Sequence, residues 1–218
     1  MNTGIFKTLA LKTSVLSILL LASYTVTAES KPAPSYNHSE LNEIKVKGFD
    51  RAAGLERLDI SQFDGFMVKQ ADLEFDRHWL REHKFHMSDN DEKRLREDYT
   101  RVLKEALENT LQKHTPLEKR DVATENTLVI EPSLTRFRLN APDLSFKGRT
   151  KDYVYTAGAA RINLKLISGE KVLTTLSDYD ETRSELSRMK ATNRVTNLRD
   201  FKQLSKRWAS KLSRYLTR

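Results

Sequence analysis

Three of the five histidines in this chain lie close together, at His78, His83 and His86. Carboxylates accompany them at Asp76 and Glu82, and imidazole and carboxylate groups are the side chains that hold zinc or copper. The spacings of five and three residues match no specific metal motif, and three arginines and lysines nearby add positive charge. We keep these histidines as metal-site candidates, favour a solvated loop or strand end instead, and expect neither a metal nor a cofactor.

Four carboxylates also lie close together in the sequence, at Asp178, Asp180, Glu181 and Glu185. A pair of carboxylates can supply the acid and the base, or the acid and the nucleophile, of glycoside hydrolysis. Their separation in space decides whether they do so, and sequence does not give that distance. With 30 acidic residues in the chain, such a cluster also arises by chance. We therefore assign no catalytic residue and keep a hydrolase with an unidentified carboxylate or histidine site as an alternative function.

Several kinds of chemistry are excluded by composition. The seven glycines are scattered, so the chain has neither a phosphate-binding loop nor a dinucleotide-binding fingerprint. The Gly-x-Ser-x-Gly pattern of a nucleophile elbow is absent. The chain contains no cysteine, which removes disulfides, thiolate nucleophiles and cysteine-bound metals.

The last segment of the chain combines aromatic and basic residues at helical spacing. Phe201, Trp208 and Tyr215 belong to its apolar stripe. The candidate contacts with an anionic surface are the basic residues Lys202, Lys206, Arg207, Lys211 and Arg214. Such a helix can lie on an anionic membrane face, or its stripe can pack on a sheet while the basic residues stay solvated. We favour packing on a sheet.

The elements that must position these residues follow from hydrophobic periodicity. A helix is predicted for residues 88–113, a second helix for the terminal segment from Leu198, and a hairpin around Ser168–Glu170. Strands are predicted within 63–80 and 127–139, and Pro132 indicates an edge strand or a bulge in the latter. We predict an α+β fold, with an antiparallel sheet packed by two amphipathic helices in a single domain.

The first residues match a secretory signal. Lys7 and Lys12 precede an apolar stretch that ends in the small-residue pattern Val26–Ala28. The uncharged interval is too short for a typical spanning helix, so we favour cleavage over a retained anchor. We predict a cleaved signal peptide at residues 1–28, a flexible leader at 29–50 and the α+β domain at 51–218. The mature protein is then periplasmic or secreted, with peripheral membrane association left open.

Short motifs resemble those of one bacterial family. They are Leu128–Thr135 (LVIEPSLT), Asn140–Pro142, Gly158–Ala160, Ser168–Leu173 and Trp208 in a closing helix. In these motifs the chain is similar to bacterial domain-of-unknown-function family 3313, a group of predicted lipoproteins. The resemblance covers about residues 60–216 and implies a cell-envelope protein with an α+β domain and no assigned catalytic residue. Because this chain lacks the acylated cysteine, we expect a soluble periplasmic form.

These observations favour a non-enzymatic binding or accessory module over an enzyme. The mature chain, without residues 1–28, has a formal net charge of about +6, which we interpret first as an ordinary charge excess on a soluble surface. If this charge marks partners, they are anionic, and in an exported protein they are envelope components rather than nucleic acid. We expect the partner to be an envelope protein or an anionic envelope surface, bound through the sheet edge near Pro132 or through the basic terminal helix. The sequence leaves the oligomeric state open.

Overall fold

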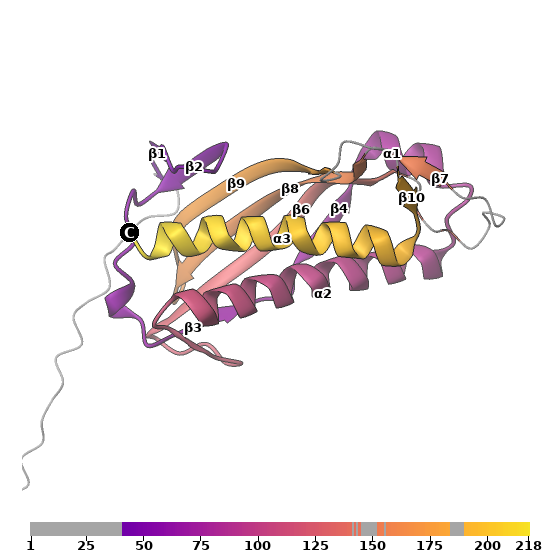
Figure 1. The fold of residues 1–218 in the computed structure, drawn as a ribbon. Helices are drawn as coiled ribbons and strands as arrows, with labels where there is room; N and C mark the ends of the chain where they lie inside the picture. The colour runs from indigo at the N-terminus through magenta and orange to yellow at the C-terminus, as the bar shows by residue number, and fades with distance from the viewer. Residues whose placement is uncertain (1–40, 141, 143, 145–151, 155, 184–189) are drawn as a thin grey trace, which may run out of the picture. The chain divides into compact units, whose positions relative to one another are not determined.

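A computed structural model of the chain describes residues 41–140, 142, 144, 152–154, 156–183 and 190–218 (Figure 1). The predicted signal peptide at 1–28, residues 29–40 of the predicted leader and Glu185 lie outside the described residues. Within these residues, a mostly antiparallel open sheet is combined with three α-helices. The predicted α+β class is therefore confirmed.

The larger sheet has eight strands within the described residues, in the order β1-β2-β9-β8-β6-β3-β5, and β4 pairs with β6 beside this path. Its strands are β1 (Glu43–Ile44), β2 (Arg51–Gly54), β3 (Gly65–Val68), β4 (Asp72–Phe75), β5 (Glu118–Lys119), β6 (Thr127–Leu139), β8 (Thr156–Ser168) and β9 (Lys171–Arg183). A separate pair joins β7 (Asp152–Val154) to β10 (Lys190–Thr192). The β8–β9 pairing is the predicted hairpin, and its turn falls at Gly169 and Glu170.

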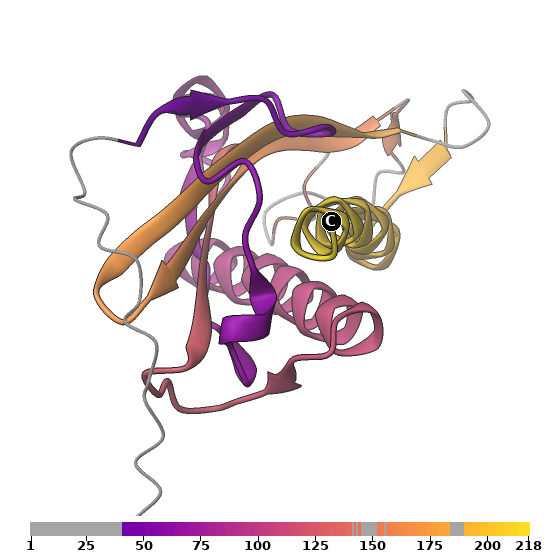
Figure 2. The same cartoon turned by 90° about the vertical axis from the view of Figure 1, so that its left-hand side faces the viewer.

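The helices are α1 (Arg77–His83), α2 (Asp89–His114) and α3 (Arg194–Leu216), with a 3₁₀ turn η1 at Ile60–Gln62. Figures 1 and 2 show α2 and α3 side by side across one face of the sheet. Helix α2 begins at a capping box between Ser88 and Asp91, and its first turn carries acids that favour the positive end of the helix dipole. It ends one residue before Thr115, next to Pro116, where a proline cannot continue the helical hydrogen bonds.

A chain of aromatic rings joins the two helices to the sheet. The Tyr99 ring of α2 meets Phe137 of β6 edge-on at 4.8 Å between centroids and Phe201 of α3 at 4.9 Å. Phe201 in turn meets Trp208 at 6.2 Å. Edge-to-face pairs of this kind add roughly 0.5–1.5 kcal/mol beyond the area that they bury. The core is therefore fixed at the point where β6, α2 and α3 converge.

The position of β6 corrects the edge strand predicted from Pro132. Strand β6 lies inside the sheet, between β8 on one side and β3 and β4 on the other. Its pairing with β3 reaches Ile130 and its pairing with β4 starts at Ser133, so Pro132 falls between two neighbours. The carbonyl of Ile130 accepts a hydrogen bond from the Lys69 N–H, on the side of β6 that faces β3 and β4. Residues two apart on a strand direct their backbone groups to the same side, so the nitrogen of Pro132 points to that side as well. The missing N–H therefore interrupts no ladder.

The irregularity of β6 lies further along the strand. The register against β8 shifts between Thr135 and Arg138, and Arg136 between them has a positive φ of 51°. This bulge changes the alternation, so that Leu134 and Phe137, three residues apart, both face the core. The path of the sheet instead ends at the two-residue strands β1 and β5, and β4 pairs with β6 beside that path.

Three predicted boundaries differ from the structure. Residues 41–50, part of the predicted leader, contain β1 and the buried Val46 because β1 pairs with β2 and extends the sheet. Residues 63–80 form β3 and β4 as predicted strands, but α1 begins at Arg77, where Asp76 accepts hydrogen bonds from two backbone N–H groups. Helix α3 begins four residues before the predicted Leu198, because Asn193 and Thr196 form a capping box.

Gly54 offers a direct test of the β2–β9 pairing. Its φ is +120°, and a Cβ atom there would lie 2.3 Å from the carbonyl oxygen of Leu173. We expect Gly54→Ala to lower the free energy of unfolding by about 1–3 kcal/mol, from backbone strain and this clash. The measurement is urea unfolding followed by circular dichroism.

Gly169 is the matched control, because its φ is +57° and a Cβ there meets nothing within 4 Å. Gly169→Ala should therefore lose only the strain term of about 1 kcal/mol. Equal losses in the two variants would contradict the close approach of β2 and β9.

Candidate functional site

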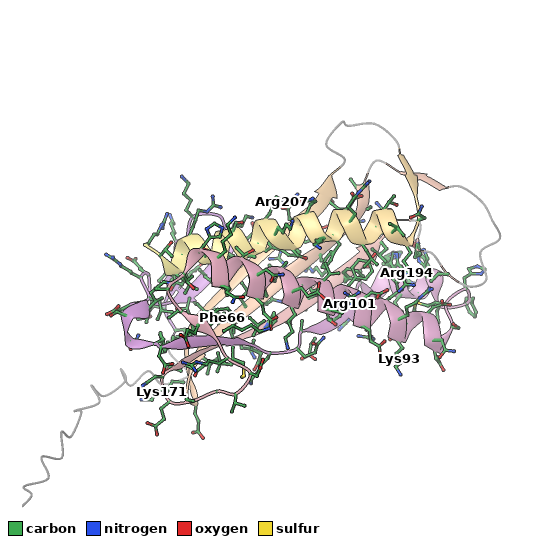
Figure 3. All side chains as sticks on the ribbon, turned by 60° about the horizontal axis from the view of Figure 1, so that its bottom comes forward. Phe66, Lys93, Arg101, Lys171, Arg194 and Arg207 are labelled. Carbon is green, nitrogen blue, oxygen red and sulfur yellow. The ribbon has the colours of Figure 1, made fainter. Side chains whose placement is uncertain are left out.

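The residues predicted to contact an anionic surface all lie on α3, so the site is built from that helix. Its inner side is buried and its outer side carries the basic residues. Near its start, Arg194 of α3 and Arg101 of α2 both pair with Asp98, at 2.7 and 3.4 Å, on neighbouring stretches of the two helices (Figure 3). The N-terminal part of α3 is thereby joined to α2.

A buried carboxylate on β9 anchors the other half of α3. Asp178 is only 4% exposed, and its Oδ2 accepts hydrogen bonds from Trp208 Nε1 at 2.9 Å and from Lys211 Nζ at 2.5 Å. Burial raises the pKa of Asp178 above its ordinary value, while Lys211 and Trp208 act in the opposite direction. A buried charge needs both a counter-charge and hydrogen bonds, and this pair of donors supplies them.

Two further contacts extend this line along β9. Towards one end, Arg207 pairs with Asp180 at 3.1 Å. Towards the other end, the Tyr215 hydroxyl donates a hydrogen bond to the Leu55 carbonyl at 2.5 Å and lies 3.0 Å from the Thr174 hydroxyl. Burial raises the pKa of Tyr215. We call these contacts, together with those of Asp178, the α3–β9 seam. Residue numbers increase along α3 as they decrease along β9, so the helix and the strand are antiparallel.

The seam divides the five predicted contact residues into two groups. Arg207 and Lys211 form intramolecular ion pairs with Asp180 and Asp178, respectively. Lys202, Lys206 and Arg214 are exposed and make no ion pair within the described part of the chain. Arg199 is exposed on the same outer side of α3. We call Arg199, Lys202, Lys206 and Arg214 the α3 basic face.

Two open grooves adjoin the last turn of α3. One has a volume of about 590 Å³ and includes Arg57, Leu216 and Arg218 in its lining. The other has a volume of about 400 Å³ and includes Lys47, Arg214 and Arg218. Sequence reasoning missed Lys47 and Arg57, since they are more than 150 residues from the end of α3 and tertiary contacts such as Tyr215–Leu55 bring the segments together.

The sheet face opposite the helices carries an ordered polar array. Asn163 of β8 donates to Thr135 at 3.2 Å and accepts from Ser177 at 2.9 Å, while Arg161 contacts Ser177 at 3.2 Å. Arg161 also lies over the Tyr179 ring, 5.7 Å from its centroid. Nearby, Glu131 pairs with Lys69 at 3.0 Å and with Lys165 at 3.2 Å, and these hydrogen bonds hold its pKa below the ordinary value. The array links strands β6, β8 and β9.

The candidate histidines are placed on and just after α1, not on a loop or strand end alone. His78 lies 3.3 Å from Glu82, and His83 stacks on Trp79 at 4.4 Å and contacts its carbonyl at 2.8 Å. His86 is exposed in the turn that follows. Across the residues that the structure describes, no group of three or more histidine, aspartate or glutamate side chains is arranged to hold a metal ion.

The predicted carboxylate cluster is divided by strand alternation. Asp178 and Asp180 face α3 and pair with its basic residues. Glu181 faces the opposite side and pairs with Arg138 at 3.1 Å, and Glu185 lies outside the described residues. The three described carboxylates therefore each have a cationic partner and do not converge on one space.

No family model and no curated protein matches the chain. Among solved structures it is similar to a PelC dodecamer variant from Paraburkholderia phytofirmans, with 11% identity, a TM-score of 0.40, and coverage of 75% of this chain and 93% of that one. A PDZ domain protein from Parabacteroides distasonis matches at 13% identity and a TM-score of 0.38, covering 75% of this chain and 34% of that one. A neuraminyllactose-binding hemagglutinin homolog from Helicobacter pylori matches at 9% identity and a TM-score of 0.35, covering 74% and 88%.

All three TM-scores lie below 0.5, so these likenesses assign neither a family nor a function. Among the helices of the described ranges, none combines the length and the apolar character needed to cross a bilayer.

The α3–β9 seam predicts unequal effects of two neighbouring aspartates. Asp178→Ala leaves Trp208 Nε1 and Lys211 Nζ without their acceptor, and we expect a loss of about 3 kcal/mol in the free energy of unfolding. Asp180→Ala removes a partly exposed pair with Arg207 and should cost about 1 kcal/mol or less. Urea unfolding measures both, and equal losses would show that Asp178 does not anchor α3.

The lowered pKa of Glu131 predicts a pH-dependent contribution to stability. A carboxyl whose folded pKa lies below its unfolded value stabilises the fold above the unfolded value, and this contribution disappears as the pH falls through the folded value. At pH 7 the free energy of unfolding of the wild type should therefore exceed that of Glu131→Gln. The difference should be about 1 kcal/mol or less, because the ion pairs of Glu131 are partly exposed.

The difference should vanish on acidification below the ordinary value of 4.5, and 1 M salt should reduce it at pH 7. Denaturant unfolding at a series of pH values measures this. A difference that grows on acidification would contradict the assigned direction.

Proposed function

We propose that the protein is an exported, non-enzymatic binding module of the bacterial cell envelope, and that its α3 basic face binds an anionic envelope surface. The observation that carries this proposal is the division of charges on α3. Lys202, Lys206 and Arg214 are exposed and unpaired within the described residues, while Arg207 and Lys211 anchor the same helix to β9. A fixed helix therefore holds its outer cations in a constant row.

The row has the dimensions and charge of a surface contact. From Arg199 to Arg214 the row spans 15 residue steps, which corresponds to about 22 Å along the helix axis. Each basic residue close to an anionic membrane surface contributes about 1 kcal/mol, and the attraction decays within a Debye length. Several such residues on one side of one helix can supply useful affinity without a pocket.

Burial separates this mode of binding from insertion into a membrane. The aromatic residues of the predicted stripe, Phe201, Trp208 and Tyr215, are at most 2% exposed because they pack into the core. The sequence leaves open that the terminal helix lies on a membrane face. Insertion of its aromatic stripe into the bilayer would conflict with the burial of these side chains in the core. Binding is therefore electrostatic, through side chains that project from the outer side.

The wider assignment belongs to the same proposal. A signal peptide at residues 1–28, periplasmic or secreted localisation, and membership of domain-of-unknown-function family 3313 rest on the sequence motifs. A single domain packed by two amphipathic helices is supported by the buried sides of α2 and α3 and by one compact unit that contains the described residues. The hydrolase alternative gains no such support, because the described carboxylates of its cluster point to two faces of the sheet.

The test is sedimentation with vesicles. We expect the purified protein to bind vesicles that contain phosphatidylglycerol, to bind pure phosphatidylcholine weakly, and to dissociate in high salt. The double change Lys202→Glu and Lys206→Glu should weaken binding about tenfold or more, because two cations become anions.

The matched control changes Lys84→Glu and Arg136→Glu, which are exposed cations outside α3 and give the same change in net charge. This control should retain most of the binding. If both double variants lose binding equally, only net charge matters and the α3 basic face is not the site. If neither loses binding, the proposed function is wrong.

A further inference from the structure

The two grooves at the end of α3 combine cationic rims with apolar floors. Both are lined by Thr217 and Arg218, so they meet at the last residues described. The first groove, of about 590 Å³, adds Arg57 together with the apolar residues Leu58, Ile60 and Leu216. The second, of about 400 Å³, adds Lys47, Arg214 and the apolar Val46. Cations and hydrocarbon are therefore side by side around a single helix end.

The cations of this region are not held in ion pairs within the described structure. Lys47, Arg57, Arg214 and Arg218 are exposed, and they make no ion pair within the described residues. The acidic residue in the lining is Asp59, which accepts hydrogen bonds from the Ser61 backbone and side chain at 3.0 and 2.7 Å. Four cations against the Asp59 carboxylate leave a local excess of positive charge in the lining of the two grooves.

The walls of the grooves are held in place before any ligand arrives. They come from the β1–β2 segment, from the residues around η1 and from α3. The Tyr215 hydroxyl ties α3 to Leu55 at 2.5 Å, and Leu58, Val46 and Leu216 are 2%, 6% and 2% exposed. A site built on packed elements in this way loses little conformational entropy on binding.

We propose that these grooves bind an amphiphilic phosphate, namely the headgroup of an anionic phospholipid with the first CH₂ groups of its chains. Arg57 and Arg218 offer planar guanidinium groups, which match phosphate oxygens with paired hydrogen bonds. Ile60 and Pro116 offer apolar surface, on which each buried CH₂ adds about fourfold to affinity. This inference rests on the proposed function, because it names one component of the anionic surface that the α3 basic face meets.

The experiment uses monomeric probes, so that a surface is not needed. Isothermal titration compares dihexanoyl phosphatidylglycerol, below its micelle concentration, with inorganic phosphate. We expect the short-chain lipid to bind at least about tenfold more tightly than phosphate, since phosphate cannot use the apolar floor. Arg57→Gln with Arg218→Gln should weaken lipid binding about tenfold or more, because charged donors to the phosphate are lost.

Two matched pairs separate charge from apolar contact. Arg77→Gln with Arg136→Gln removes exposed arginines elsewhere and should leave lipid binding within about twofold. Ile60→Ser should weaken lipid binding several-fold and leave phosphate binding unchanged, whereas Val195→Ser, at a 75% exposed residue near the start of α3 that lines neither groove, should change neither. Circular dichroism confirms that each variant is folded.

The outcomes distinguish this inference from the proposed function. The variant Lys202→Glu with Lys206→Glu should lose vesicle binding and keep short-chain lipid binding, since neither lysine lines a groove. Equal affinities for phosphate and lipid would identify a free-phosphate site and overturn the lipid assignment. Absence of lipid binding, or lipid binding that survives Arg57→Gln with Arg218→Gln, would overturn it as well, even if vesicle binding is retained through α3.

Discussion

The carboxylate of Asp178 determines where α3 lies. Its two donors, Trp208 and Lys211, are three residues apart on the helix, so both reach one acceptor on β9 only when α3 has a particular rotation. That rotation places Phe201 and Trp208 in the aromatic core and leaves the lysines between them on the outer side. The buried contact of Asp178 with Trp208 and Lys211 thereby determines which side of α3 packs in the core and which side is exposed to partners.

The contacts of α3 with β9 explain why the sequence predicted the buried side of α3 but not which of its basic residues form ion pairs. Hydrophobic periodicity identified the buried stripe correctly, because burial of large side chains follows the helical repeat. It could not divide the basic residues, since Lys206 and Arg207 are adjacent and chemically alike. Their difference depends on Asp180, an acid 27 residues away in sequence whose proximity is a property of the tertiary structure.

Other features escaped prediction for related physical reasons. Helix α1 has seven residues and one buried side chain, Trp79, so it is too short to show a period. Pro132 is typical of edge strands, yet β6 is central because two short strands succeed each other beside it. The grooves at the end of α3 join segments far apart in the chain, and no local pattern indicates such a meeting. The α+β class, the long helix α2 and the β8–β9 hairpin were predictable because each depends on local periodicity and turn residues.

The outermost strands of the sheet, β1 and β5, contain two residues each. Beyond β2, the Tyr179 N–H on the outer side of β9 is already taken by the Asp50 carboxylate at 2.9 Å. At β1 and β5 a second copy of the chain therefore finds only a two-residue ladder to extend, which disfavours edge-to-edge addition at these two strands.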